Sequence, residues 1–308
     1  MHVAVAIVGF GNAEDVVRCF AALARSDYPD FEVVVCENGG VAAFATLQRA
    51  IPCRLPNGQS VQLIQAAGNG GYASGVNLCM AASPKSDAWW ILNPDTEPSA
   101  GAMRAMVERL KAGCDAVGGP LSLPNGIIQS YGGRWRAWLA RSVSIGYGAS
   151  LEAETDTEAI EQAQNYLNGA SMLVSRRFLE TTGPMREEFF LYCEEIDWCL
   201  RAASRGMRLG FAPASHVFHR QGTTTGYHGD LATRSRLSVY LDERNKMLLT
   251  RYHFPARLPV AALSAFLLIV LRYLRRGAVR QFGYGISGWL AGLQGKCGVP
   301  TWMRAAEG

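Results

Sequence analysis

The sequence lacks the features that mark secreted, disulfide-stabilised or membrane-spanning proteins. Its eight cysteines include no Cys-x-x-Cys pair, and most lie in apolar runs such as residues 33–36, so we expect reduced, buried thiols and neither disulfides nor a cysteine metal site. Residues 1–5 carry no basic segment, unlike a secretory signal. The longest apolar run, residues 258–271, has 14 residues, whereas a membrane-spanning helix needs roughly 20. We therefore expect a cytoplasmic protein that touches a membrane at most from its inner face.

Charged residues are scarce and unevenly distributed. They make up 18% of the chain, against about a quarter in an average soluble protein. Residues 255–308 carry seven basic residues (Lys or Arg) and one acidic residue (Asp or Glu). Residues 1–254 therefore carry 23 basic and 25 acidic residues. The basic end predicts an anionic partner. Because its arginines follow an apolar run, we expect contact between residues 255–308 and an anionic membrane surface, and no nucleic acid. The alternative is that this run packs on the rest of the chain as a core helix.

Short apolar runs alternate with helical patterns in the first third of the chain. Strands are predicted at residues 3–8, 31–36, 61–64 and 88–92, with helices at 13–24 and 41–50. This alternation predicts an α/β fold, with a Rossmann-like, mostly parallel sheet flanked by helices. Ligands bind such sheets at the carboxyl ends of the strands.

The remainder of the chain is less regular, and its end is helical. We predict loops with a hairpin around residues 131–133, strands at 168–174, 208–212 and 217–219, a helix at 194–204, and helices from residue 231 onward. The 308 residues amount to about two domain lengths. We expect an α/β domain over residues 1–230 and a helical, basic extension over residues 231–308.

The glycines after the first strand do not form a dinucleotide-binding motif. Gly9 and Gly11 match the first two positions of G-x-G-x-x-G, but the third position is Glu14. A carboxylate there would repel a pyrophosphate. A nicotinamide-dependent dehydrogenase is therefore disfavoured, and the glycines are explained by a tight turn.

Two carboxylates follow the strand at residues 88–92. Asp95 and Glu97 lie two residues apart between prolines, and hard oxygen ligands at this spacing suit Mg²⁺ or Mn²⁺. A purely conformational role for an aspartate in a turn is the alternative. His219 ends a later strand and would complete a metal set, although a lone histidine is more often structural.

Three acids begin the helix at residues 194–204. First-turn acids complement the helix dipole, and Asp197 has a partner four residues on in Arg201. Glu194 and Glu195 follow an aromatic run, and such neighbours would desolvate a carboxylate and raise its pKa toward the range of a general base. Only one of the two can face a given hydroxyl.

The chain resembles glycosyltransferase family 2, in particular its rhamnosyltransferase-like branch. The segments that carry the resemblance are residues 69–73 with Asn77, and residues 92–97, 168–174, 189–201 and 219–224. The five segments have the order and spacing of the family's motifs, which makes the resemblance specific.

The resemblance implies a GT-A fold and assigns roles to individual residues. Nucleotide-sugar binding falls on Gly9, Glu37, Asn69, Gly71, Asn77, Asn93, Asp95 and Gly169. The metal would lie on Asp95, Glu97 and His219, and the catalytic carboxylates would be Glu195, as general base, and Asp197. Glu37, Glu97 and Glu195 stand where the family usually has aspartate.

The implied activity is inverting sugar transfer with Mg²⁺ or Mn²⁺. The donor would be a nucleotide diphosphate sugar, dTDP-L-rhamnose in the first place, and the acceptor a saccharide or polyprenyl-linked saccharide in cell-surface polysaccharide synthesis. A nucleotidyltransferase is one alternative, although residues 9–15 contain no Lys or Arg. A non-catalytic carbohydrate- or membrane-binding module on a degenerate transferase scaffold is the other.

Overall fold

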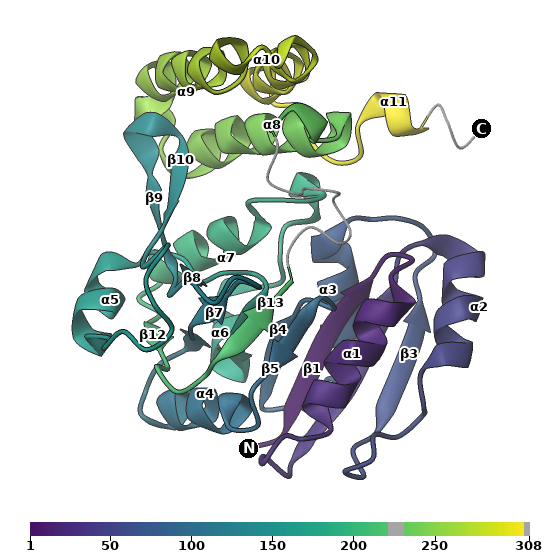
Figure 1. The fold of residues 1–308 in the computed structure, drawn as a ribbon. Helices are drawn as coiled ribbons and strands as arrows, with labels where there is room; N and C mark the ends of the chain where they lie inside the picture. The colour runs from purple at the N-terminus through teal and green to yellow at the C-terminus, as the bar shows by residue number, and fades with distance from the viewer. Residues whose placement is uncertain (221–230, 305–308) are drawn as a thin grey trace.

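A seven-stranded sheet forms the centre of the fold (Figure 1). The structure is a computed structural model that describes residues 1–220 and 231–304. In sheet order the strands are β12 (Leu209–Phe211), β6 (Ala116–Gly118), β11 (Ser171–Ser175), β4 (Ala88–Leu92), β1 (Val3–Gly9), β2 (Phe31–Glu37) and β3 (Val61–Gln65). All neighbouring pairs are parallel except those of β11, which runs antiparallel to both β4 and β6. The predicted mostly parallel sheet is confirmed.

Helices cover both faces of this sheet. They are α1 (Ala13–Leu23), α2 (Gly40–Ala50), α3 (Tyr72–Ala82), α4 (Ala102–Lys111), α5 (Thr157–Ala163), α6 (Arg176–Thr182) and α7 (Glu194–Ala203). Successive strand residues point to opposite faces, so Trp89 joins one hydrophobic cluster and Trp90 the other. Both indoles are almost fully buried. Burying each large apolar side chain stabilises the fold by about 1.5–3 kcal/mol, which explains the near-continuous apolar sequence of β4.

A smaller sheet and a hairpin lie beside the central sheet. The smaller sheet has the order β5 (Thr96–Pro98), β13 (Val217–His219), β7 (Leu121–Ser122) and β8 (Ile128–Ser130). The hairpin joins β9 (Gly133–Arg136) through η1 (Ala137–Leu139) to β10 (Arg141–Ser144). The predicted hairpin around residues 131–133 was wrong, because Gly133 starts a strand there and the chain reverses at Ala140, which has a φ of 44°.

The end of the chain is helical, as predicted. It contains η3 (Leu231–Thr233), α8 (Arg236–His253), η4 (Pro255–Arg257), α9 (Leu258–Tyr273), η5 (Leu274–Arg276), α10 (Val279–Leu293) and α11 (Thr301–Arg304). α10 packs closely along α8 because Gly288 and Gly292 lie against the carbonyls of Tyr240 and Arg244, where a methyl group would clash. Figure 1 shows these helices as a layer above the sheet domain, which the β9–β10 hairpin reaches.

One helical segment has the length and apolar composition of a membrane span. It covers Pro255–Arg276, 22 residues, and only 28% of its most apolar window is buried. The short apolar run seen in the sequence thus belongs to a longer helix. The boundary predicted at residue 230 and the end of the motif at 219–224 fall on residues 221–230, outside the described residues.

Candidate active site

The carboxyl ends of β1, β2 and β4 meet at one edge of the sheet. Gly9 pairs with Glu37 in the register of β1 and β2, and Asn93 directly follows β4. The Glu37 Oε1 atom accepts hydrogen bonds from the backbone N–H groups of Gly11 and Gly39, at 3.0 and 2.7 Å. Its Oε2 atom is buried without a hydrogen-bond partner, and a side chain at position 9 would clash with it. A buried unpaired acceptor is costly, so this carboxylate is suited to a hydrogen-bond donor from a ligand.

The turn before α3 is built to approach another loop closely. Asn69 accepts a hydrogen bond from the Gly71 N–H at 3.1 Å, and Gly71 has a φ of 89°. A side chain there would overlap the Phe190 carbonyl, so only glycine fits. Asn77 bonds both the N–H and the carbonyl of Met185, at 3.1 and 3.0 Å. The structure therefore gives Asn69, Gly71 and Asn77 roles in holding loops together.

A tyrosine inside the same motif links three parts of the site. The Tyr72 hydroxyl lies 2.9 Å from both the Asn93 Oδ1 atom and the Gly169 carbonyl. Burial and the nearby acids raise its pKa well above the usual value, so it remains a hydrogen-bond donor. A Cβ atom added at Gly169 would lie 3.4 Å from the Glu195 side chain. Glu195 therefore lies close to the residues that follow β4.

Asp95 and His219 come together, whereas Glu97 has another partner. His219 Nε2 lies 3.3 Å from Asp95 Oδ1, and its Nδ1 lies 2.7 Å from Gln129 Oε1. With Nδ1–H donating to Gln129, two acceptor atoms face each other between His219 and Asp95 unless a proton or a cation lies there. A histidine oriented in this way is typical of metal ligands. Glu97 instead pairs with Arg220 at 2.8 Å. Within residues 1–220 and 231–304, no three His, Cys, Asp or Glu side chains are grouped as a metal set.

The paired acids begin α7 after a strained loop. Phe190, Tyr192 and Cys193 all have positive φ angles of 66–75°, which costs of order 1–3 kcal/mol for each such residue. Burial raises the pKa of Glu195 to about 7. Burial, together with the charge of Glu195, raises the pKa of Glu194 to about 8. A carboxylate with a pKa near 7 suits general-base chemistry at neutral pH.

Glu195 borders a cavity of about 640 Å³. α7 forms one wall, α8 and α9 form another, and Arg141 and Ser142 of β10 border it as well. The cavity therefore lies between the sheet domain and the helical layer. A hydroxyl group held there would have a single carboxylate of α7 beside it.

Sequence comparison decides the family. A family model described as "Glycosyltransferase like family 2" matches residues 2–244. The chain belongs to glycosyltransferase family 2.

Individual relatives of this transferase agree with that assignment. It is 26% identical to the low-salt glycan biosynthesis hexosyltransferase Agl10 of Haloferax volcanii, over 86% of this chain and 87% of that one. It is 24% identical to the N-acetylglucosaminyl-diphospho-decaprenol L-rhamnosyltransferase of Mycobacterium tuberculosis, over 72% of this chain and 77% of that one. The expected resemblance and the expected transferase class are confirmed.

Solved structures show the same GT-A fold. The mannosyltransferase PcManGT from Pyrobaculum calidifontis, in complex with GDP-Man and Mn²⁺, superposes with a TM-score of 0.58 at 14% identity, over 96% of this chain and 88% of that one. GalNAc-T7 with UDP, GalNAc and Mn²⁺ gives a TM-score of 0.63 at 12% identity, over 82% of this chain. This chain spans about half the length of GalNAc-T7, 48%.

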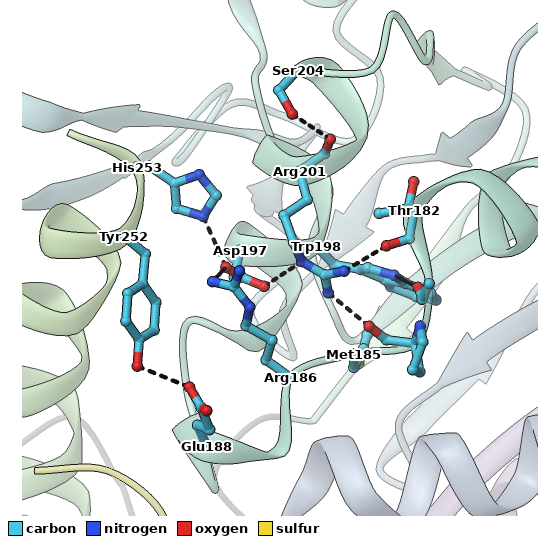
Figure 2. Close-up of polar contacts among 12 residues, drawn as sticks. Thr182, Met185, Arg186, Glu188, Asp197, Trp198, Arg201, Ser204, Tyr252 and His253 are labelled. Atoms are coloured by element: carbon cyan, nitrogen blue, oxygen red, sulfur yellow. Dashed lines mark hydrogen bonds and ion pairs between the residues drawn. The ribbon is translucent and has the colours of Figure 1, made fainter.

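In this glycosyltransferase Asp197 lies in a buried ionic network (Figure 2). Its carboxylate is fully buried and pairs with Arg186, Arg201 and His253 at 3.0, 2.8 and 2.8 Å. The pairing with Arg201 was predicted from the spacing. Burial raises the pKa of Asp197, but the hydrogen bond with His253 and the charges of Arg201 and Arg186 outweigh it and hold the pKa below its usual value. Asp197 does not border the cavity, so the geometry gives it the role of fixing α7 to α8 and lends no support to a catalytic one.

Asn245 on α8 holds the strained loop, a role that sequence reasoning missed. Its Nδ2 atom lies 2.8–2.9 Å from the carbonyls of Phe189, Leu191 and Tyr192. Arg244 donates to the Phe189 carbonyl at 2.9 Å, and both side chains are buried. The signal in the sequence was the polar run at residues 242–246, which interrupts an otherwise largely apolar stretch of α8. Gln129, beside His219, left no such signal.

Proposed function

We propose that this glycosyltransferase is inverting and metal-dependent, and moves L-rhamnose from dTDP-L-rhamnose to a saccharide or polyprenyl-linked saccharide in cell-surface polysaccharide synthesis. The observation that carries the proposal is Glu195, a carboxylate with a pKa raised to about 7 at the border of a cavity. The L-rhamnosyltransferase and hexosyltransferase relatives support the sugar class.

Glu195 would remove the proton from the acceptor hydroxyl as its oxygen attacks the anomeric carbon. A single displacement requires the base and the leaving diphosphate to lie on opposite faces of the sugar. Glu195 lies beside Gly169, and Tyr72 links Gly169 to Asn93, which supports this arrangement. Glu194 Oε2 is buried without a hydrogen-bond partner that could stabilise a negative charge. Glu194 would therefore stay protonated, and Glu195 would act as the base.

The nucleotide would lie on the edge formed by β1 and β2. The unpaired Glu37 Oε2 atom would accept a hydrogen bond from the base or the ribose, and Gly9 keeps the space beside it open. Asn93 would lie on the donor side of the same edge. Asn69, Gly71 and Asn77 would act indirectly, through the loops that they hold.

The residues present fit a divalent cation beside the diphosphate. Asp95 and His219 would hold Mg²⁺ or Mn²⁺, with Gln129 orienting the imidazole. When bound, the metal would neutralise charge that develops on the leaving diphosphate. Glu97 would join this set only by leaving its ion pair with Arg220.

The C-terminal helices would contact the cytoplasmic face of an anionic membrane. Val260, Leu263, Leu267, Leu271 and Leu274 recur every three or four residues along α9 and η5, each 41–61% exposed. A continuous exposed apolar face of this kind marks an interaction surface. Arg275 and Arg276 follow it, and each basic residue near an anionic leaflet contributes about 1 kcal/mol.

Vesicle binding tests this membrane proposal. The protein should co-sediment with phosphatidylglycerol vesicles and not with phosphatidylcholine vesicles. A variant with Leu263→Glu and Leu267→Glu should remain in the supernatant. Equal sedimentation of the variant and the wild type would reject the membrane contact.

A nucleotide screen tests the donor and the metal together. The melting temperature is measured with dTDP, UDP or GDP, with and without Mn²⁺, and nucleotide release is then followed with dTDP-L-rhamnose. We expect dTDP to stabilise the protein most, and only with Mn²⁺ present. Preference for GDP would overturn the donor assignment, and stabilisation that is equal in EDTA would overturn the metal.

A further inference from the structure

The residues that follow α10 pack against the loop before the candidate base. Gly298 donates its N–H to the Glu188 carbonyl at 2.6 Å, and its own carbonyl accepts a hydrogen bond from Arg244 at 2.6 Å. The same guanidinium donates to the Phe189 carbonyl at 2.9 Å. One short segment is therefore hydrogen-bonded, directly and through Arg244, to two successive residues of the loop that leads to Glu195.

Apolar side chains of the same segment, residues 298–303, join the strained part of this loop. Val299 and Met303 belong to the hydrophobic cluster that contains Phe190 and Tyr192. Phe190 and Tyr192 are two of the three loop residues with positive φ angles. Such a backbone persists only where the surrounding contacts hold it. The segment supplies contacts of this kind.

Trp302 attaches the segment to α8. Its ring lies edge-to-face with the Tyr240 ring, with the centroids 6.1 Å apart, and the guanidinium carbon of Arg236 lies 4.3 Å from its centroid. Among the described residues the indole N–H has no hydrogen-bond partner, so the ring itself makes the attachment. Tyr240 belongs to the same hydrophobic cluster as Phe190. The contacts of Trp302 thus continue to the loop through Tyr240.

We propose that the 298–303 segment positions Glu195 by holding the 188–193 loop in the conformation from which α7 starts. Glu195 is the second residue of α7, so a change in the loop moves its carboxylate. Trp302 is then a positioning residue that acts through the loop. The segment lies outside residues 2–244, which the family model matches, so membership of the family does not imply this role. The proposal rests on the proposed function, in which Glu195 is the base.

Hydrogen exchange in the full chain tests whether the segment holds the loop. Exchange of the 188–193 amides is compared by mass spectrometry in the wild type and in Trp302→Ala, well below both melting temperatures. Trp302 is only partly buried, so the variant should fold, which a melting curve checks. Losing both ring contacts shifts the attachment equilibrium by about tenfold, and we expect the loop to exchange faster by about that factor. Unchanged exchange of the loop overturns the proposal.

Steady-state kinetics of the same variant test whether the effect reaches Glu195. We expect kcat to fall by about tenfold or more, because a small displacement of a catalytic group is costly in rate. The donor KM should change little, since the donor would lie at the strand ends. Trp302→Phe keeps an aromatic ring between Tyr240 and Arg236 and should recover most of kcat. A wild-type kcat in Trp302→Ala, or a loss that Trp302→Phe does not recover, overturns the positioning role.

Trp138→Ala is the matched control. Trp138 lies on η1 and is 52% exposed. It also faces an arginine, because the guanidinium carbon of Arg257 lies 5.0 Å from its ring centroid. Its loss removes the same kind of contact from a different element and should leave both loop exchange and kcat at the wild-type values. Equal effects of Trp138→Ala and Trp302→Ala would contradict the proposal.

The two proposals fail separately. A wild-type chain that transfers no rhamnose contradicts the proposed function, while exchange of the 188–193 amides still shows whether the segment holds the loop. A chain that transfers rhamnose with the same kcat in the wild type and in Trp302→Ala contradicts the positioning role alone.

Discussion

Asn245 offers a direct test of how the fold positions the candidate base. Its two N–H groups serve three carbonyls of the loop that contains Phe190, Tyr192 and Cys193, all with positive φ. Each hydrogen bond contributes about 1 kcal/mol net, and a buried carbonyl left unpaired costs about 1–3 kcal/mol. Asn245→Ala should therefore lower the free energy of unfolding by about 3 kcal/mol.

Loss of the three Asn245 hydrogen bonds should also slow the reaction. The loop can then relax toward ordinary backbone angles, and Glu195, two residues after Cys193, would shift with it. A displacement near 1 Å can cost about 10²-fold in rate. We expect kcat to fall by about that factor while the KM for the donor changes little, because Glu37 ends β2 and Asp95 lies in the turn between β4 and β5, outside this loop.

Denaturant unfolding and steady-state kinetics check these two effects. Thr250→Val is the matched control, because Thr250 is a buried residue on the same helix whose hydroxyl donates to the Lys246 carbonyl, within α8. It should lose stability without losing kcat. A positioning role for Asn245 is refuted by one result. Asn245→Ala would be less stable than the wild type and would still show the wild-type kcat when assayed well below its melting temperature.

Three further predictions concern charge. Glu194 has a pKa raised to about 8 by burial, so the folded state binds more protons than the unfolded chain between about pH 4.5 and 8, and stability should fall as pH rises through that window. Glu194→Gln should flatten this decline in melts from pH 5 to 9, and an equally steep decline in the variant would contradict the assignment. Asp197→Ala should cost about 3–5 kcal/mol because it leaves Arg201 and His253 without their buried carboxylate, as urea unfolding would show; a loss below 1 kcal/mol would count against the network. Gln129→Ala should weaken Mn²⁺ binding about 10–100-fold through His219, and unchanged Mn²⁺ affinity in a titration would argue against His219 as a ligand.

Local patterns predicted the central sheet well. β1, β2 and β4 were predicted to within a residue or so, because their side chains are buried on both faces and their apolar runs end at Gly, Glu and Asn. The helix from Glu194 was also found, since acids in its first turn and Arg201 in its last mark both ends. The antiparallel direction of β11 was not predicted, because the apolar sequence of a short buried strand does not indicate whether it pairs parallel or antiparallel.

The site was predicted in part, for a physical reason. Side chains that follow strands come together by sheet geometry alone, which explains Gly9, Glu37 and Asn93. The pairing of Asp95 with His219 depends on β13 lying beside β5, and the clamp by Asn245 depends on α8 packing over the 189–193 loop. Such contacts join residues far apart in sequence, so no local pattern encodes them; Asp95 and His219 were grouped only through their ligand chemistry and the family resemblance.

The identity of the base is tested most directly by Glu195→Gln. General-base catalysis contributes about 10²–10⁴-fold, so turnover should fall by that factor while the affinity for the nucleotide sugar, measured by calorimetry, stays near the wild-type value. In the wild type the rate should also fall as pH drops below about 7, where Glu195 takes up its proton. Full activity in Glu195→Gln would contradict the account.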